Sequence, residues 1–184
     1  NLVYVMDTDN NRIIELQYTE KKQVELIRVI DKFNAPENIV NTFNAPTDLF
    51  ISDEGDYYIA DTKNGRVLKL DKDLNYIFAL YEPDDPTYEK GKEFLPQRVV
   101  ADKKGRVYVL AKNVNKGFVK YEYDGTFTGF YGASEVIYDW TDYVWKKFAT
   151  RAQREQMESF VPTEYSNCYM DSEGFIYAVT KTFD

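Results

Sequence analysis

The amino-acid sequence predicts an all-β fold in which one four-stranded unit is repeated. Within residues 44–80, four short runs rich in β-branched and aromatic residues alternate with three turn signals. Each run is too short for a helix and has the composition of a strand. The same pattern returns along the chain at a nearly constant spacing. Four antiparallel strands joined by short turns form one blade of a β-propeller, so we expect three to four blades arranged as an open arc.

The unit in residues 44–80 sets the pattern for the other copies. Its turns contain glycine, which tolerates a positive φ, and Asn or Asp, whose side chains bond to nearby backbone groups. The expected strands are Leu49–Ile51, Tyr57–Ala60, Val67–Leu70 and Tyr76–Leu80. Repeats of this kind are sought first, because a missed repeat leads to a wrong fold.

A shift of fifty residues places the next copy on this unit, with Pro46 on Pro96 and Gly55 on Gly105. A later copy begins at Val161-Pro162 and repeats the turn at Gly174. The whole chain is therefore predicted to be one propeller domain or part of one, residues 1–184. Its blade parts are 1–31, 46–81, 96–131 and 161–184.

The first copy aligns with the 44–80 unit at an offset of 54, which pairs Asp7 with Asp61 and Arg12 with Arg66. Each aspartate ends a strand just before a turn. We expect these carboxylates to form turn contacts or ion pairs with the following arginines. The alternative is catalysis by paired carboxylates, which needs two acids about 5–9 Å apart in a cleft.

Residues 134–160 interrupt the repeat. Ile137, Trp140, Val144 and Phe148 step by three, four and four residues, which is one face of a helix. A capping-box pattern at Thr150 and Gln153 predicts a second short helix. We therefore expect a helical hairpin inserted between two blades.

Several motifs resemble those of NHL-repeat β-propellers. They are Asn44-Ala45-Pro46, Tyr58-Ile59-Ala60-Asp61 and the Asn-Gly-Arg or Asn-Asn-Arg that opens the third strand of a blade. The later part, with residues 148–150 and 160–167, is similar to a subgroup of bacterial secreted or envelope-associated NHL propellers. This resemblance implies an extracellular or cell-envelope location. Because such propellers serve as scaffolds, ligand binders and occasionally enzymes, it does not select one activity.

The composition of the chain argues against some classes of binding partner and some types of catalytic site. The net charge of −8 opposes binding to nucleic acid or to an anionic membrane surface. The sequence contains no histidine and one cysteine, Cys168, so it offers no Ser-His-Asp triad, no Cys-His pair and no internal disulfide. We expect Cys168 to be a small buried residue. No stretch of this sequence is predicted to insert into a membrane.

The first strand of each propeller blade lines the central channel, and the connections into it open on one face. Polar residues at these positions are candidates for ligand binding. They are Thr47, Asp48, Asp61, Gln97, Arg98, Lys112, Glu164 and Tyr165. The alternative is an ordinary solvated channel mouth. Tyr143 and Trp145, partly off the apolar face of the predicted helix, are candidates for a partner surface.

We therefore expect a non-catalytic binding or scaffold propeller that recognises a protein or carbohydrate partner through its channel-mouth loops. The alternative is a propeller hydrolase or lactonase with an oxygen-ligated metal in the channel. We favour the non-enzymatic role, with no cofactor and no bound metal, because the sequence lacks histidine. We also expect the arc to be completed by further blades of a longer chain or by self-association.

Overall fold

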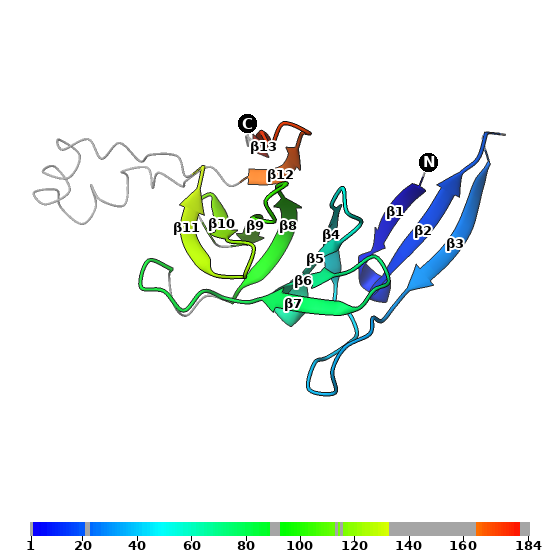
Figure 1. Ribbon diagram of the computed structural model, residues 1–184, viewed down its shortest axis with the longest axis horizontal. Helices are drawn as coiled ribbons and strands as arrows, with labels where there is room; N and C mark the ends of the chain where they lie inside the picture. The colour runs from blue at the N-terminus through cyan, green and yellow to red at the C-terminus, as the bar shows by residue number, and fades with distance from the viewer. Residues whose placement is uncertain are drawn as a thin grey trace, which may run out of the picture.

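The structure is a computed structural model of the 184-residue chain, shown as a ribbon in Figure 1. It describes residues 2–20, 23–88, 93–112, 114, 116–132 and 165–180. The predicted helical hairpin at 134–160 lies outside the described residues, together with Tyr143, Trp145 and Glu164.

The described residues form four antiparallel sheets, which we call blades one to four in chain order. Blade one contains β1 (Leu2–Asp7), β2 (Arg12–Tyr18) and β3 (Val24–Ile30). Blade two contains β4 (Pro46–Ile51), β5 (Tyr57–Asp61), β6 (Arg66–Leu70) and β7 (Tyr76–Leu80). Blade three contains β8 (Leu95–Ala101), β9 (Val107–Lys112), β10 (Phe118–Tyr121) and β11 (Phe127–Tyr131). Blade four contains β12 (Tyr165–Met170) and β13 (Ile176–Thr180).

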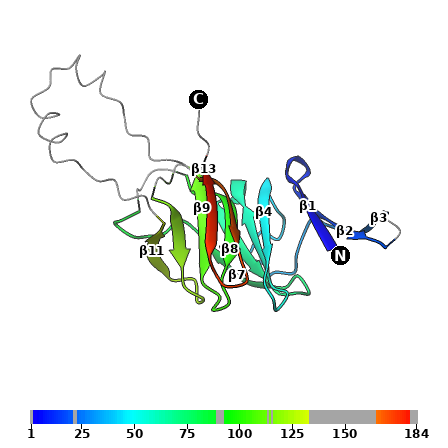
Figure 2. The ribbon, with the colours of Figure 1, turned by 90° about the horizontal axis from the view of Figure 1, so that it is seen from above.

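Within every blade, consecutive strands are hydrogen-bonded neighbours, as in an up-and-down meander. The blades are arranged around an open arc, with β4 and β8 nearest a shared centre and β7 and β11 on the outside (Figure 1). The inner strands contact one another from blade to blade, β4 with β8 and β8 with β12. In Figure 2, β13 lies in front of β8 and β9, and side chains of blade four pack against blade three in a shared hydrophobic cluster. This all-β architecture confirms the predicted propeller arc.

The turns between the first two strands of blades two, three and four follow one design. In each, a glycine with positive φ donates its N–H to a carbonyl three residues earlier: Gly55 to Ser52, Gly105 to Asp102 and Gly174 to Asp171. Two 3-10 turns, η1 (Thr8–Asn10) and η2 (Thr62–Asn64), connect β1 to β2 and β5 to β6. None of the described helices has the length and apolarity needed to cross a membrane.

The hydrophobic core lies between the blades. Ile13 and Ile30 of blade one share a cluster with Ile59 and Leu68 of blade two. Tyr58 and Leu80, also of blade two, share a second cluster with blade three, including Val99, Val119 and Tyr121. Removal of such a side chain from water contributes roughly 1.5–3 kcal/mol. Adjacent blades are therefore held face to face by apolar packing.

The connection from blade two to blade three, residues 82–93, contains two prolines and many charged residues, a composition that predicts a solvated loop or the rim of a binding face. In the structure, Tyr88 from this connection is buried. Its ring stacks with that of Phe130 at a centroid distance of 6.3 Å and meets Phe94 edge-on at 6.3 Å. At least this part of the connection is therefore packed against blade three.

Candidate functional site

The inner strands β4, β8 and β12 begin with the same irregularity. In each, the pairing register shifts by one residue near the start of the strand, at Pro46/Asp48, Pro96/Arg98 and Tyr165/Asn167. A bulge of this kind bends the strand and redirects the side chains beside it. It gives Asp48, Arg98 and Asn167 equivalent positions in three consecutive blades.

Asp48 connects blade two to blade three. Its Oδ2 accepts a hydrogen bond of 2.8 Å from the backbone N–H of Val99 in β8. Burial raises the pKa of Asp48, although the Val99 N–H and the charge of Arg98 both act to lower it. The carboxylate is therefore partly shielded from water, and it already accepts one backbone hydrogen bond.

Arg98 connects three blades through its guanidinium group. Its Nε donates to Asn167 Oδ1 in blade four at 3.0 Å, and its Nη1 donates to the carbonyl oxygen of Gln97 at 2.7 Å. A longer contact of 3.5 Å joins Nη1 to the carbonyl oxygen of Thr47 in blade two. A guanidinium has five N–H donors. Among the described residues no hydrogen bond uses Nη2, so this nitrogen can serve a ligand.

The hydroxyl groups of Thr47 and of Thr62, which belongs to η2, extend this polar region. Thr62 Oγ1 donates to the carbonyl oxygen of Pro96 at 2.6 Å and lies 2.7 Å from Thr47 Oγ1. Thr47 Oγ1 also lies within 3.0 Å of the carbonyl oxygen of Gln97, whose side chain is exposed. We call Thr47, Asp48, Gln97, Arg98 and Asn167 the inner-strand polar cluster.

The structure brings four of the predicted site residues together, Thr47, Asp48, Gln97 and Arg98. Two further members of the surroundings, Thr62 and Asn167, were not predicted. Asn167 could have been found by counting, because Asp48, Arg98 and Asn167 each lie seven residues before the turn glycine of their blade. The repeat was instead aligned from Val161-Pro162, which lie outside the described residues, and Asn167 received no assignment.

The other candidates within the described residues lie outside this cluster. Asp61 is fully buried and is held by Arg66, as the turn-and-ion-pair interpretation expected. Lys112 is exposed at the end of β9, opposite Leu95. Tyr165 turns toward blade three: its hydroxyl donates to the carbonyl oxygen of Gly132 at 2.9 Å and its ring stacks on Phe118.

The chemistry available here is that of hydrogen-bonded recognition. A guanidinium, an amide and a carboxylate lie along one row, and they can bind a polar ligand that both donates and accepts. Burial raises the pKa of the neighbouring Cys168 to about 12, so its sulfur is a thiol at neutral pH and a weak nucleophile. In the described ranges, no group of three or more His, Cys, Asp or Glu side chains is arranged to hold a metal ion.

No protein-family model matches the chain, and no curated protein matches it. Among solved structures, the chain is similar to a catalytically inactive virginiamycin B lyase from Staphylococcus aureus with quinupristin. That match has 16% identity and a TM-score of 0.42, and it covers 70% of this chain and 36% of the lyase. A protein of unknown function from Bacteroides caccae matches at 14% identity and a TM-score of 0.45, over 69% of this chain and 43% of its own.

A streptogramin B lyase structure matches at 16% identity and a TM-score of 0.44, over 70% of this chain and 36% of the lyase. The matched region thus spans less than half of each of these proteins. A likeness at these levels carries no argument about what this chain binds or catalyses. Its assignment to the NHL-repeat propellers stays a prediction, and the described residues form an arc of propeller blades.

Proposed function

We propose that this chain is a non-catalytic binding module that recognises a protein or carbohydrate partner through the inner-strand polar cluster. The observation that carries the proposal is the position of Arg98. Its guanidinium is held by acceptors from three successive blades, and no hydrogen bond within the described part of the chain uses Nη2. A side chain held in this way loses little conformational freedom when it binds, which favours affinity.

The group recognised by Arg98 is an acceptor, and a carboxylate fits it best. Charge-assisted hydrogen bonds from guanidinium to carboxylate are about twice as strong as neutral ones. A protein would supply this group from an acidic side chain, and a carbohydrate would supply it from a uronic acid. Exposed Gln97, beside Arg98, offers further amide donors to the same ligand.

The proposal is tested by titrating the chain with tetraglutamate and with tetragalacturonate in a calorimeter. We expect saturable binding of one of them, and we expect Arg98→Ala to weaken it by roughly tenfold or more, since hydrogen bonds to charged groups contribute about 1.5–3 kcal/mol. Lys72→Ala is the matched control, because Lys72 is an exposed cation in the β6–β7 turn. Equal losses in the two variants would show only general attraction by positive charge.

A second measurement separates binding from catalysis. The bound probe is recovered after incubation and its mass is determined. We expect it to be unchanged. Turnover of the probe, or binding that requires an added divalent cation, would contradict the non-catalytic module and favour the metal-dependent hydrolase.

A further inference from the structure

An open hollow lies at the end of β7, where the connection to blade three passes the β10–β11 turn. It has a volume of about 380 Å³, within the range of about 300–1,000 Å³ that is usual for ligand pockets. Its floor is apolar: Leu80 and Tyr121 are buried, and Phe127 meets the Tyr121 ring edge-on at a centroid distance of 6.1 Å. The Tyr121 hydroxyl donates to the carbonyl oxygen of Tyr81 at 2.8 Å, which attaches the connection to this floor.

The corresponding place between blade one and blade two is filled by side chains of the chain itself. Phe33, in the connection after β3, is buried in the hydrophobic cluster there, and Leu74 of the β6–β7 turn packs against this cluster. The N–H of Asn34, beside Phe33, donates to the carbonyl oxygen of Leu74 at 2.9 Å. In blade two, the connection and the turn are therefore packed together through a phenylalanine and a leucine.

Blade three has smaller residues at these two positions. Gly125 corresponds to Leu74, because each has a positive φ and donates its N–H to the carbonyl oxygen three residues earlier at 2.9 Å. Pro83 corresponds to Phe33, because each lies three residues after the end of its outer strand. The leucine side chain is missing and a proline replaces the phenylalanine. The space that these side chains fill in blade two is therefore part of the hollow in blade three.

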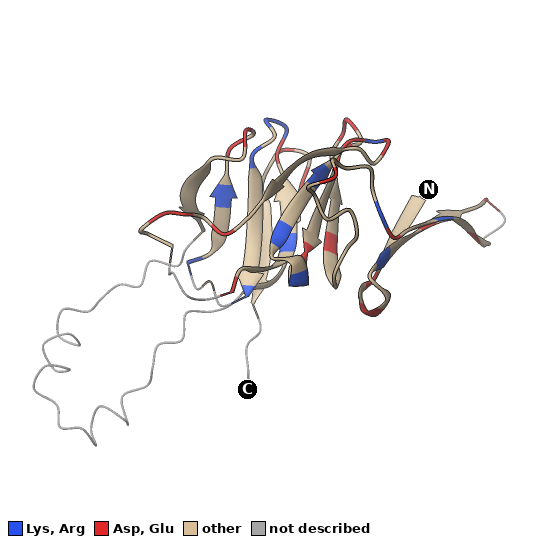
Figure 3. Ribbon diagram, turned by 90° about the horizontal axis from the view of Figure 1, so that it is seen from below, with Lys and Arg blue, Asp and Glu red and all other residues tan. Residues whose placement is uncertain are grey.

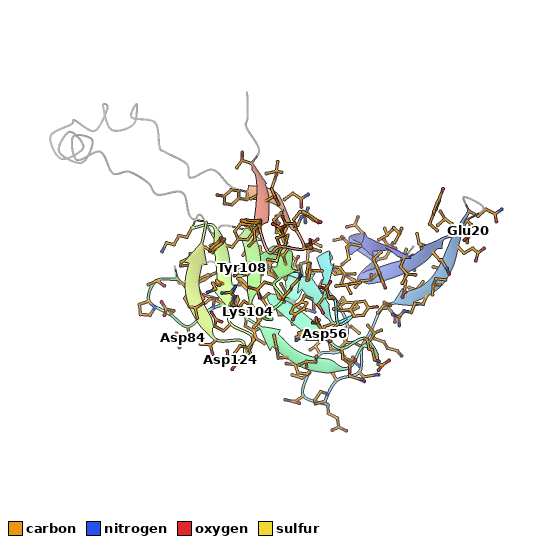
Figure 4. The ribbon with its side chains drawn as sticks, turned by 45° about the horizontal axis from the view of Figure 1, so that its top comes forward. Glu20, Asp56, Asp84, Lys104, Tyr108 and Asp124 are labelled. Atoms are coloured by element: carbon orange, nitrogen blue, oxygen red, sulfur yellow. The ribbon has the colours of Figure 1, made fainter. Side chains whose placement is uncertain are left out.

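The rim of the hollow is acidic. Glu82, Asp84 and Asp85 line it, and no Lys or Arg is among its described lining residues. Figure 3 shows acidic residues along this connection, and Figure 4 labels Asp84 and also Asp124 of the β10–β11 turn. Asp85 accepts the N–H and the hydroxyl of Thr87, whereas the side chains of Glu82 and Asp84 are exposed. The charge at the rim therefore favours a cationic group.

We propose that this hollow is a docking site for a protein partner that inserts a leucine or phenylalanine side chain flanked by lysine or arginine. The apolar floor, and the side chains that fill the corresponding place in blade two, indicate the inserted residue. The acidic rim indicates the flanking charges, because complementary charges select a partner and speed its association. An apolar centre within a polar rim is the common arrangement of protein interfaces. This site is independent of the function proposed for the inner-strand polar cluster.

The test is a calorimetric titration of the chain with four capped pentapeptides. Lys-Lys-Leu-Lys-Lys and Lys-Lys-Phe-Lys-Lys are the expected ligands. Lys-Lys-Gly-Lys-Lys keeps the charge without the apolar side chain, and Gln-Gln-Leu-Gln-Gln keeps the leucine without the charge. We expect at least one expected ligand to bind roughly tenfold or more tightly than the glycine peptide, the scale of burying one large apolar side chain. It should also bind more tightly than the glutamine peptide.

Two variants test the apolar part of the site. Gly125→Leu should weaken binding of the expected ligand by roughly tenfold, because it places in the hollow the side chain that blade two has there. Its Cβ would lie 3.3 Å from a methyl group of Leu80, so Tyr81→Ala at the rim is a second variant. Tyr123→Ala is the matched control for Tyr81→Ala, because Tyr123 is exposed in the β10–β11 turn and does not line the hollow. Melting temperatures establish that each variant is folded.

A third variant tests the acidic rim. Glu82→Gln combined with Asp84→Asn should weaken binding several-fold, the scale of losing two exposed charge pairs. Asp53→Asn combined with Glu54→Gln is the matched control, because it removes the same charge from two exposed acids of the β4–β5 turn. Arg98→Ala should leave binding unchanged, so this proposal and the proposed function can fail separately.

Three outcomes would each overturn the docking site. The first is equal affinity for the glycine peptide and both expected ligands. The second is equal loss in the two acid-to-amide variants, which would show only general attraction to a negatively charged chain. The third is unchanged binding in folded Tyr81→Ala and Gly125→Leu variants.

Discussion

Arg66 donates a hydrogen bond from Nε to Asp61 Oδ2 over 2.8 Å, and the two side chains are only 3% and 0% exposed. Asp61 Oδ1 also accepts the backbone N–H of Asn44, and Arg66 Nη2 donates to the carbonyl oxygens of Val40 and Thr42. The pair therefore attaches the segment that joins blade one to blade two. Asp7 and Arg12 form the same pair in blade one at 2.7 Å, with side chains 21% and 40% exposed.

Asp61→Ala should destabilise the chain strongly. Removing one partner of a buried ion pair leaves the other charge without compensation, which costs about 3–5 kcal/mol. Asp7→Ala is the matched control, and we expect a much smaller change there because water can solvate Arg12. Urea unfolding followed by circular dichroism gives both values. Similar losses at the two sites would show that burial of the pair around Asp61 has little energetic effect.

Substitution of Asp48 by alanine and by asparagine should have different effects on the free energy of unfolding. Asp48→Ala leaves the N–H of Val99 without its acceptor, which should cost about 1–3 kcal/mol. Asp48→Asn keeps an acceptor oxygen and removes the unfavourable burial of a charge. We expect its unfolding free energy at pH 7 to lie within about 1 kcal/mol of the native value.

The pH dependence gives an independent check on Asp48. Burial raises the pKa of this carboxyl, so its contribution to stability is fully present below the pKa of the unfolded chain and is lost as pH rises through the folded value. Asp48→Asn should lack this part of the pH dependence, which begins near the ordinary carboxyl pKa of about 3.9 and extends upward from there. An unaltered profile in the variant would contradict the assignment.

Blade one presents an apolar face on the side away from blade two. Val3 and Val5 of β1 are exposed there, as is Val29 of β3. Exposed apolar surface of this kind promotes association. We therefore expect the chain to self-associate with rising concentration, and we expect Val3→Lys combined with Val5→Lys to reduce this.

Light scattering coupled to size-exclusion chromatography measures that association directly. Val40→Lys is the control, because Val40 is exposed in the segment that joins blade one to blade two. A native chain that stays monomeric at all concentrations would contradict the prediction, and so would equal effects of the β1 and Val40 substitutions.

The propeller blades could be predicted because they depend on local patterns. The spacing of Gly55, Gly105 and Gly174 fixes three equivalent turns, and all three glycines have the expected positive φ. The pairing of Arg12 with Asp7 and of Arg66 with Asp61 also follows from an offset in the sequence. These features depend only on residues that are close together in the chain, so they can be predicted from the sequence.

Contacts between blades were harder to predict, because they depend on how the repeats are placed in space. Asn167 was missed since Tyr165 occupies the position held by Pro46 and Pro96, which removes the proline that marks the start of an inner strand. Tyr88 was predicted to lie in a loop because its sequence neighbours are polar, although its ring stacks on that of Phe130.

Cys168 is half-buried, where the sequence predicted a buried residue, and it should react slowly in the folded chain. Burial raises its pKa to about 12, and the charge of Asp48 adds to this effect, although Arg98 opposes it. The thiolate is the reactive form, so a disulfide reagent at pH 8 should label Cys168 slowly in native buffer and rapidly in urea. Native labelling as fast as that of the unfolded chain would contradict the raised pKa of this thiol.

The same shift predicts a loss of stability in alkali. Below about pH 8 the thiol is protonated in both states and the shift has no effect on the pH dependence. Between about pH 8.5 and 12, the unfolded chain releases the proton while the folded chain retains it, so the free energy of unfolding falls as pH rises. Burial raises the pKa of Tyr88 to about 12 and acts in the same direction. Cys168→Ala should therefore reduce the slope between pH 8 and pH 10 without abolishing it, and a slope equal to the native one would show that Cys168 titrates normally in the folded chain.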